Sequence, residues 1–309
     1  MDYSNNETYP DYFEATMYEK VLQNVEKFCI IPLGTIGNIL IIIIMTQTKN
    51  RNHASSVIFT SLAVSDIAIL WIGWFNSIEL STTVGCKIGN FIGYTVVQLS
   101  SLLLATVAVE RAFCVKMPHN VKTIFSVANT KKMVVSIVIV LILINSCTVI
   151  SFEAVTIDGI LSCMPRGELE YFMYAIHPWL DLTLSFLITF VVSVTSSVLI
   201  ISQLRTRSRI VGTSKNDRSH SVTMALLGAN FTFLITMCPF VIAQIVNPYP
   251  SYGTRDYHLW TTLLNLSQSN AAANFYVYVL SGPKFRADLK EFFVTYYSRF
   301  CMICRGRVA

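Results

Sequence analysis

Long stretches without charged residues dominate the pattern of hydrophobic and polar positions along the chain. The uncharged stretches are 21 residues between Lys27 and Lys49, 22 between Lys87 and Glu110, 20 between Lys132 and Glu153, 23 between Asp181 and Arg205, and 27 between Asp256 and Lys284. A helix that crosses a bilayer needs about 20 mainly apolar residues. Each stretch is therefore long enough to span a membrane, and the core of a soluble enzyme is excluded.

Two further stretches complete the pattern. Residues 54–77 are interrupted only by Asp66, and residues 219–254 hold no Lys, Arg, Asp or Glu. The sequence therefore predicts an all-α bundle of seven membrane helices near residues 28–48, 54–78, 87–116, 132–152, 174–204, 220–246 and 257–281. Residues 1–27 form an acidic extracellular segment, residues 28–281 the bundle, and residues 282–309 an amphipathic eighth helix with a short tail.

The distribution of basic residues predicts the orientation of the bundle. Of the 23 Lys and Arg residues, 18 lie in or next to the segments joining predicted helices one to two, three to four and five to six, or after helix seven. Cytoplasmic segments retain Lys and Arg, so the amino terminus is outside and the chain is a multi-pass plasma-membrane protein. The net charge of +5 then reflects this topology, and we expect lipid rather than nucleic acid as its partner.

The composition agrees with this class, because 53% of residues are apolar and only 13% are charged, against about 25% in soluble domains. Cys86, at the outer end of the third helix, and Cys163, in the loop before helix five, both face an oxidising compartment. Their placement favours a disulfide over two unrelated thiols.

Polar residues inside the predicted spans are candidates for function, because they are costly in hydrocarbon. Asn38, Asp66, Ser100, Asn270 and Asn274 lie mid-helix on four spans. If they face one axis, a carboxylate and several neutral oxygens would suit a sodium ion. The alternative is a hydrogen-bonded network that packs the helices, and the two are compatible.

Glu110 and Arg111 are adjacent at the cytoplasmic end of the third helix. The pair is either an interfacial anchor or a latch that closes a cytoplasmic crevice.

Several short motifs occur in a fixed order along nearly the whole chain. They are Gly37-Asn38, Leu62 to Asp66, Cys86, Glu110-Arg111-Ala112, Pro118, Phe233 with Pro239, Asn274 to Tyr278, and Phe285-Arg286. In this order, with 25 positions from Cys86 to Arg111, the set resembles the rhodopsin-like (class A) G-protein-coupled receptors. The resemblance implies a receptor that couples to a heterotrimeric G protein. It also implies an activation switch formed by Glu110, Arg111, Phe233, Met237, Pro239, Asn274 and Tyr278.

The chain also departs from the family pattern. Ala112 replaces the usual aromatic residue after the arginine, Met237 stands at the tryptophan position of helix six, and Phe275 replaces the helix-seven proline. Helix five has no interior proline, unless Pro178 serves near its outer end. These departures point to a rival hypothesis of a constitutively active or decoy receptor.

Two ligand classes are disfavoured by single positions. Gly93 stands where aminergic receptors have an aspartate, and Gln268 stands where opsins have the retinal-binding lysine. Both remain candidate ligand-contact residues. The outer surface favours a peptide instead, because the acidic residues Glu168 and Glu170, and the tyrosines beside acids (Tyr3, Tyr9 and Tyr12), would attract cations. A solvated acidic segment without ligand contact is the alternative.

Two modifications follow from the topology. Asn6 begins an Asn-Glu-Thr glycosylation motif on the outer side, and the juxtamembrane Cys301 and Cys304 are candidates for palmitoylation or remain free thiols. No metal-ligand spacing, nucleophile elbow or phosphate loop is present, so we expect no enzymatic activity and no required cofactor. A seven-helix transporter is the remaining alternative, but the chain lacks an internal repeat and a pair of broken helices.

Overall fold

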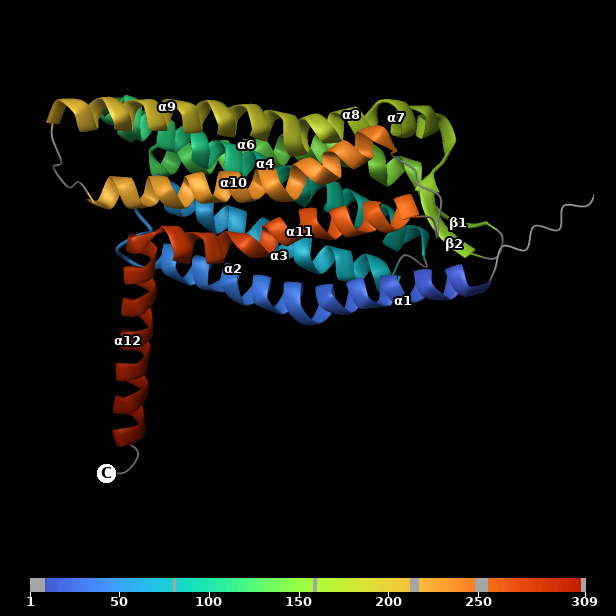
Figure 1. The fold of residues 1–309 in the computed structure, drawn as a ribbon, viewed down its shortest axis with the longest axis horizontal. Coiled ribbons are helices and arrows are strands. Elements are labelled where there is room, and N and C mark those ends of the chain that lie inside the picture. Colours follow the sequence, from blue (N-terminus) through green and yellow to red (C-terminus); the bar gives the residue numbers. More distant parts are fainter. Residues whose placement is uncertain (1–8, 80–81, 158–159, 212–216, 248–254, 307–309) are drawn as a thin grey trace, which may run out of the picture.

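The computed structural model describes residues 9–79, 82–157, 160–211, 217–247 and 255–306. In these parts of the chain, seven long helices lie side by side as a bundle (Figure 1). Their membrane-facing surfaces are apolar: Leu143 and Ile150 on α6 (Val127–Ser151) are 67% and 69% exposed. Helices satisfy their own backbone hydrogen bonds, which hydrocarbon requires. The predicted all-α seven-helix bundle is confirmed.

The first membrane helix begins earlier than the predicted residue 28. The helix α1 (Tyr9–Val25) continues through a π-helical turn, Glu26–Ile30, into α2 (Ile31–Thr46). Tyr18 explains part of this extension, because its hydroxyl hydrogen-bonds Thr262 and its ring packs edge-on against His258, with centroids 4.9 Å apart. Both partners lie on α11 (Arg255–Ser281), so α1 rests against the seventh helix.

The next helices are α3 (Ala54–Glu79) and α4 (Thr83–Lys116), joined to α6 through the short α5 (Pro118–Ile124). The helix α4 contacts α3, α6 and α9 (Ile188–Val211), so it lies at the centre of the bundle. The hydrophobic core includes Leu62, Leu103, Phe233, Phe275 and Tyr278.

Glycines on α2 allow the close approach of α11. A Cβ atom at Gly37 would lie 2.8 Å from Cβ of Phe275, and one at Gly34 would lie 2.7 Å from Cβ of Ala272. The missing side chain at Gly37 thus makes the space that Phe275 fills.

An antiparallel hairpin, which the sequence did not predict, covers the outer end of the bundle (Figure 1). It consists of β1 (Phe152–Ile157) and β2 (Ile160–Pro165), with Ala154 paired to Cys163. Cys163 is bonded to Cys86 on α4, with Cα atoms 5.7 Å apart, which confirms the predicted disulfide. The bond holds the hairpin against the bundle.

Helix five is broken at its outer end. A 3-10 turn, Gly167–Leu169, and α7 (Glu170–Ala175) precede α8 (His177–Leu182), and a π-helical turn, Thr183–Leu187, leads into α9. Pro178 lies in the first turn of α8, where its missing N–H is tolerated. The helix therefore restarts at His177 after the break, with Pro178 in its first turn.

Helix six is α10 (Asp217–Val246), which contains Pro239 in its interior. Within the described residues, six helical spans are long and apolar enough to cross a membrane, and α11 is not one of these six. The seventh helix carries polar residues on its inner side, including Asn270 and Asn274. The amphipathic α12 (Pro283–Gly306) follows it and points away from the bundle axis (Figure 1), as the predicted eighth helix.

Candidate ligand cavity and activation switch

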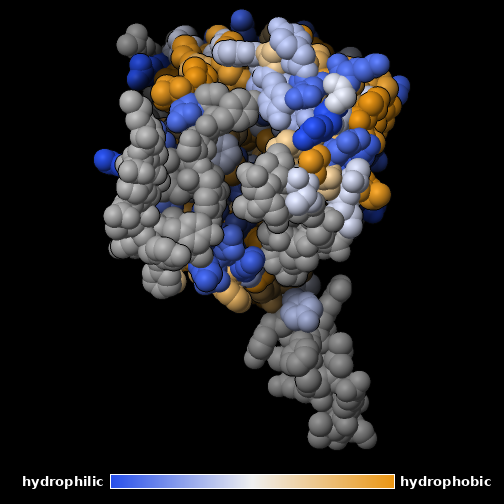
Figure 2. All heavy atoms as spheres, turned by 90° about the vertical axis from the view of Figure 1, so that its right-hand side faces the viewer, coloured by the Kyte–Doolittle hydropathy of each residue, from blue (hydrophilic) through white to orange (hydrophobic). Residues whose placement is uncertain are grey.

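Two cavities open at the hairpin end of the bundle. The outer cavity, about 520 Å³, is lined by hairpin residues such as Phe152 and Pro165 and by Trp179. The inner cavity, about 420 Å³, reaches down to Met237 and Phe233. Tyr94, Asp181, Gln244 and Trp260 line both. Figure 2 views this end of the molecule and shows hydrophilic residues gathered between hydrophobic ones at its edges.

The two helix positions proposed for ligand contact, Gly93 and Gln268, both line the inner cavity. A Cβ atom at Gly93 would meet nothing within 4 Å, so the missing side chain leaves room there. Glu168, in the 3-10 turn, and Glu170, at the start of α7, are exposed and do not line either of the two cavities. Tyr3 and Asn6 lie outside the described residues. Tyr9 and Tyr12 belong to α1, but the structure does not describe their side chains.

The floor of the inner cavity leads to a buried polar cluster. Ser100, which lines the cavity, donates to Asp66 at 2.6 Å, and Asn274 donates to the other carboxylate oxygen at 2.7 Å. Asp66 is fully buried. The structure therefore brings together three of the polar residues that the sequence singled out, from α3, α4 and α11.

The remaining polar residues of that group behave differently. Asn38 donates to the carbonyl oxygens of Gly34 and Ala271, at 3.0 and 2.9 Å, so it links α2 to α11 and does not bind Asp66. Asn270 lines the inner cavity, and its buried side-chain oxygen has no hydrogen-bond partner in the described part of the chain; the same is true of the side-chain oxygen of Asn274.

Hydrophobic residues connect this cluster to the inner end of the bundle. Phe233 is 1% exposed and stacks on Phe186 of helix five, with centroids 5.9 Å apart. Tyr278 is 3% exposed and packs edge-on against Phe59 at 5.1 Å. Movement of helix six or seven would have to break these contacts, because packed cores rearrange between discrete states.

Glu110 and Arg111 contact a third residue, Ser55, which sequence reasoning missed, and the polar cluster of these three residues is named the lock below. The side chains of the pair lie 3.5 Å apart, from Nε of Arg111 to Oε2 of Glu110. Ser55 on α3 donates to Glu110 at 2.7 Å and accepts from Arg111 at 2.5 Å. The serine thus ties both charged residues of α4 to the start of α3.

For a receptor of the family that the sequence resembles, replacing Ser55 with alanine is expected to raise ligand-free signalling by about fivefold or more. Glu110 is 4% exposed, and an acceptor that loses its buried donor costs about 1–3 kcal/mol. The cost raises the free energy of the conformer in which Arg111 contacts Glu110 and Ser55. It therefore shifts the equilibrium toward a conformer in which these contacts are broken. The measurement is second-messenger output without ligand, normalised to surface expression. Ser55→Thr keeps the hydroxyl and should match wild type; unchanged output for Ser55→Ala would contradict the lock.

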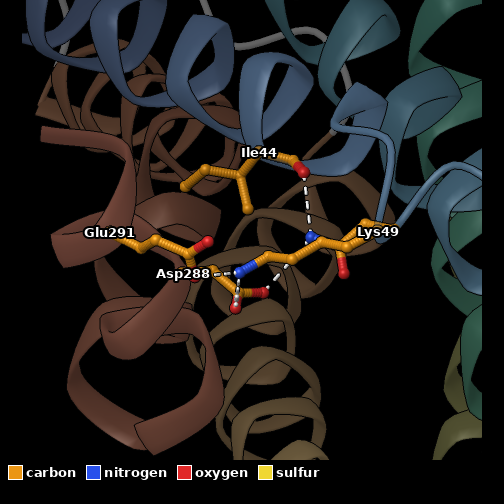
Figure 3. A network of polar contacts seen from close by, with 5 residues as sticks. Ile44, Lys49, Asp288 and Glu291 are labelled. Atoms are coloured by element: carbon orange, nitrogen blue, oxygen red, sulfur yellow. Dashed lines mark hydrogen bonds and ion pairs between the residues drawn. The ribbon is translucent and has the colours of Figure 1, made fainter. Parts of the chain in front are cut away.

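A second polar network fixes α12 to the segment that joins α2 to α3. Lys49 contacts Asp288 at 2.9 Å and Glu291 at 2.5 Å, as Figure 3 shows. Asn50 donates to Asp288 at 3.2 Å and to the Ile44 carbonyl at 3.0 Å. The amphipathic helix is thereby held at the end of α2.

Lys49→Ala is expected to accelerate backbone hydrogen exchange in residues 285–296, because the two carboxylates lose their cation. The hydrogen bond to Glu291, with support from Asp288, raises the pKa of Lys49. A raised lysine pKa means that the stabilisation is complete below its ordinary value of about 10.4 and is lost only as the pH rises through the higher folded value. Exchange in wild type, corrected for intrinsic rates, should thus be constant from pH 6 to 9. Lys49→Arg keeps the charge and is the control; exchange in Lys49→Ala equal to wild type would contradict this role.

Comparison with known proteins agrees with this geometry. The family model described as "7 transmembrane receptor (rhodopsin family)" matches residues 37–278, which covers the inner cavity, the Asp66 cluster and the Glu110–Arg111–Ser55 lock. The chain belongs to this rhodopsin family of seven-transmembrane receptors. It is therefore a multi-pass receptor of the plasma membrane, and the family is one of signalling receptors rather than enzymes.

Individual relatives of this receptor match over shorter segments. Human C-X-C chemokine receptor type 5 is 34% identical over 101 residues, which is 30% of this chain and 27% of the relative. Human neuromedin-U receptor 2 is 32% identical over 101 residues, 30% of this chain and 24% of the relative. The chicken thyrotropin-releasing hormone receptor is 24% identical over 110 residues, 33% of this chain and 28% of the relative. The matched segments thus span about a quarter of these relatives.

Proposed function

We propose that this receptor transmits the binding of an extracellular peptide to a heterotrimeric G protein. The observation that carries the proposal is the continuous arrangement of a cavity at the outer end, the buried Asp66 cluster beneath it and the closed lock at the inner end. The similar receptors have names that refer to chemokines, neuromedin U and thyrotropin-releasing hormone, which supports a peptide as the ligand class.

The mechanism is a shift between two populations. A ligand that prefers the open conformer moves helix six outward about the Pro239 region of α10, where the helix lacks one backbone hydrogen bond. Arg111 then leaves Glu110 and Ser55 and forms part of a crevice for the G protein. The ligand shifts this equilibrium only by its differential affinity for the two conformers.

The Asp66 cluster suits a sodium ion in the closed conformer. Asp66 and Ser100 supply oxygen ligands, and the buried side-chain oxygens of Asn270 and Asn274 have no partner among the described residues. A bound cation would offset the charge of the buried carboxylate and stabilise the closed helices. No other cofactor is part of the proposal.

The proposal also includes two kinds of covalent modification and one further contact with the peptide. Asn6 is a glycosylation site, and Cys301 and Cys304 carry palmitoyl groups that hold α12 at the inner leaflet; the structure describes none of these three side chains. The acidic amino-terminal segment with Tyr3, Tyr9 and Tyr12 binds cationic residues of the peptide.

The test is a screen of basic and amidated peptides on cells that express the receptor with chimeric G proteins. We expect a response that is lost in Arg111→Ala and weakened when residues 2–14 are removed. Lys87→Ala, on the outer side and away from the lock, is the control for Arg111→Ala. No response to any peptide, with high ligand-free output that only Arg111→Ala abolishes, would contradict the proposal.

That contrary outcome would favour the rival constitutive receptor. Met237, at the tryptophan position of helix six, is 9% exposed and lines the inner cavity. A flexible thioether there packs less specifically than an aromatic ring, which would lower the barrier between the closed and open conformers.

A further inference from the structure

We propose that Asp181 anchors a cationic group of the ligand, a guanidinium or an ammonium, at the junction of the outer and inner cavities. The inference deepens the proposed function, on which it rests, by naming the chemistry that the cavities recognise. Asp181 lies on α8, and its side chain lines both cavities together with Tyr94, Gln244 and Trp260.

A chain of buried amides holds this carboxylate in place. Gln98 donates to Oδ1 of Asp181 at 2.9 Å, and Asn145 donates to the side-chain oxygen of Gln98 at 2.8 Å. Gln98 and Asn145 are 1% and 0% exposed. Because Asn145 fixes which end of Gln98 faces Asp181, the amide donates to the carboxylate, and the anchor is rigid before any ligand arrives.

The second oxygen of this carboxylate is the binding group. In the part of the chain that the structure describes, the Asp181 side chain accepts a hydrogen bond from Gln98 alone, and it does so through Oδ1. Asp66 is a useful contrast, because each of its oxygens accepts a short hydrogen bond, from Ser100 and from Asn274. Among the described residues, Asp181 therefore keeps one carboxylate oxygen without a hydrogen-bond donor, whereas both oxygens of Asp66 are occupied.

Among the described residues, the charge of Asp181 has no counterpart in the cavities. The described residues that line the outer and inner cavities include no Lys or Arg, and Asp181 is the single acidic residue among them. The described residues hold no group of three or more His, Cys, Asp or Glu side chains that would bind a metal ion there. A carboxylate in such a setting is costly unless it is paired, and a ligand cation supplies the partner through a charge-assisted hydrogen bond.

Aromatic residues line the same two cavities. Trp260 and Tyr94 line both cavities, Trp179 and Tyr174 line the outer one, and Phe240 lines the inner one. Phe240 packs edge-on against Trp260, with centroids 5.6 Å apart, which holds that wall in place. Aromatic faces attract guanidinium and ammonium groups. The carboxylate and rings together match an arginine or lysine side chain, a free amino terminus or a small aromatic amine.

Gly93 lies in the same cavity as Asp181 and leaves space there. Gly93 leaves helix three without the acid that aminergic receptors have at this position, but Asp181 places a carboxylate in the same cavity from helix five. Open space at Gly93 then gives the cation and its neighbouring groups room to approach.

The primary test measures thermal stability of the purified full-length receptor with benzamidine, a flat aromatic cation, and with neutral benzamide as the matched probe. We expect benzamidine at millimolar concentration to raise the melting temperature of wild type, and benzamide to have little effect. Asp181→Asn keeps an acceptor for Gln98 and removes the charge, so it should lose the benzamidine effect. Glu170→Gln removes an exposed charge outside the cavities and should retain it.

Either of two results would overturn the proposal: benzamidine fails to stabilise wild type up to tens of millimolar, or it stabilises Asp181→Asn to the same extent. Normal melting of Asp181→Asn without ligand confirms that it folds. If that variant is unstable, Asp181→Glu, which retains the charge, should recover benzamidine binding, and a failure to do so would count against the anchor.

A second arm separates the sources of the cation and keeps the anchor distinct from the proposed function. For the most potent peptide of the screen, each Arg is replaced by neutral citrulline. One replacement should weaken binding to wild type by about 30-fold or more, as expected for a lost buried ion pair, and should have little further effect on Asp181→Asn. Equal losses in both receptors would contradict the anchor while leaving the peptide receptor intact. Benzamidine binding without any peptide response would support the anchor for a small amine and contradict the peptide proposal.

Discussion

Gly228→Ala is expected to raise ligand-free signalling by about fivefold or more. An added Cβ atom at Gly228 on α10 would lie 2.9 Å from Cγ1 of Val277 and 3.0 Å from Oγ of Ser281, both on α11. The β-branched Val277 has little rotamer freedom in a helix, so the clash cannot be relieved by a simple rotation. Overpacking costs about 1–3 kcal/mol, and this cost disappears when helix six moves away from helix seven. A shift of that size changes a two-state population by about 5–150-fold.

The measurement is G-protein activation without ligand at equal surface expression. Ile235→Ala is the control on the same helix, because Ile235 is 52% exposed on the membrane-facing surface, and we expect wild-type output from it. Equal output from Gly228→Ala and wild type would show that the contact between α10 and α11 at this point does not restrain the open conformer. Arg111→Ala combined with Gly228→Ala should remain silent.

Asp66→Ala is expected to destabilise the receptor severely. The substitution leaves the buried donors of Ser100 and Asn274 without their acceptor, and each unsatisfied donor costs about 1–3 kcal/mol. The loss is a large part of the 5–15 kcal/mol by which proteins are usually stable. We expect a lower melting temperature in detergent and reduced surface expression. Asp66→Asn keeps one acceptor and should lie between alanine and wild type; wild-type stability of Asp66→Ala would contradict the role of the cluster.

The same variants test the sodium proposal. Sodium chloride should raise the melting temperature of wild type more than choline chloride at equal ionic strength. Asp66→Asn should abolish this difference, because it removes the charge that attracts the ion. A sodium effect of equal size in the variant would place the ion elsewhere.

The sequence predicted the bundle because membrane helices leave a strong signal in uncharged length and in basic loops. The hairpin was missed, because β1 and β2 are only six residues each and their register depends on the disulfide and the helices around them. The early start of the first helix was missed for a similar reason, since Tyr18 gains its partners from α11. These features depend on contacts between distant segments, and no local pattern reports them.

The candidate site was only partly predictable. Asp66, Ser100 and Asn274 were found because polar residues inside an apolar span are conspicuous. Asp181 carried the same signal, since it lies inside the span predicted for residues 174–204, but it was used only to mark the boundary of an uncharged stretch. Ser55 offered no signal, because a serine near a helix end is ordinary and its contact with Arg111 depends on how α3 packs on α4.

The most direct test of the account is whether the inner end of the bundle changes affinity at the outer end. The measurement is the dissociation constant of the most potent peptide from the screen, on receptor in lipid nanodiscs, with and without saturating nucleotide-free G protein. Coupling between the two ends is reciprocal, so we predict about tenfold tighter binding with G protein in wild type, and none of this gain in Arg111→Ala. Equal affinity with and without G protein in wild type would contradict the central claim that the outer cavities and the lock report one equilibrium.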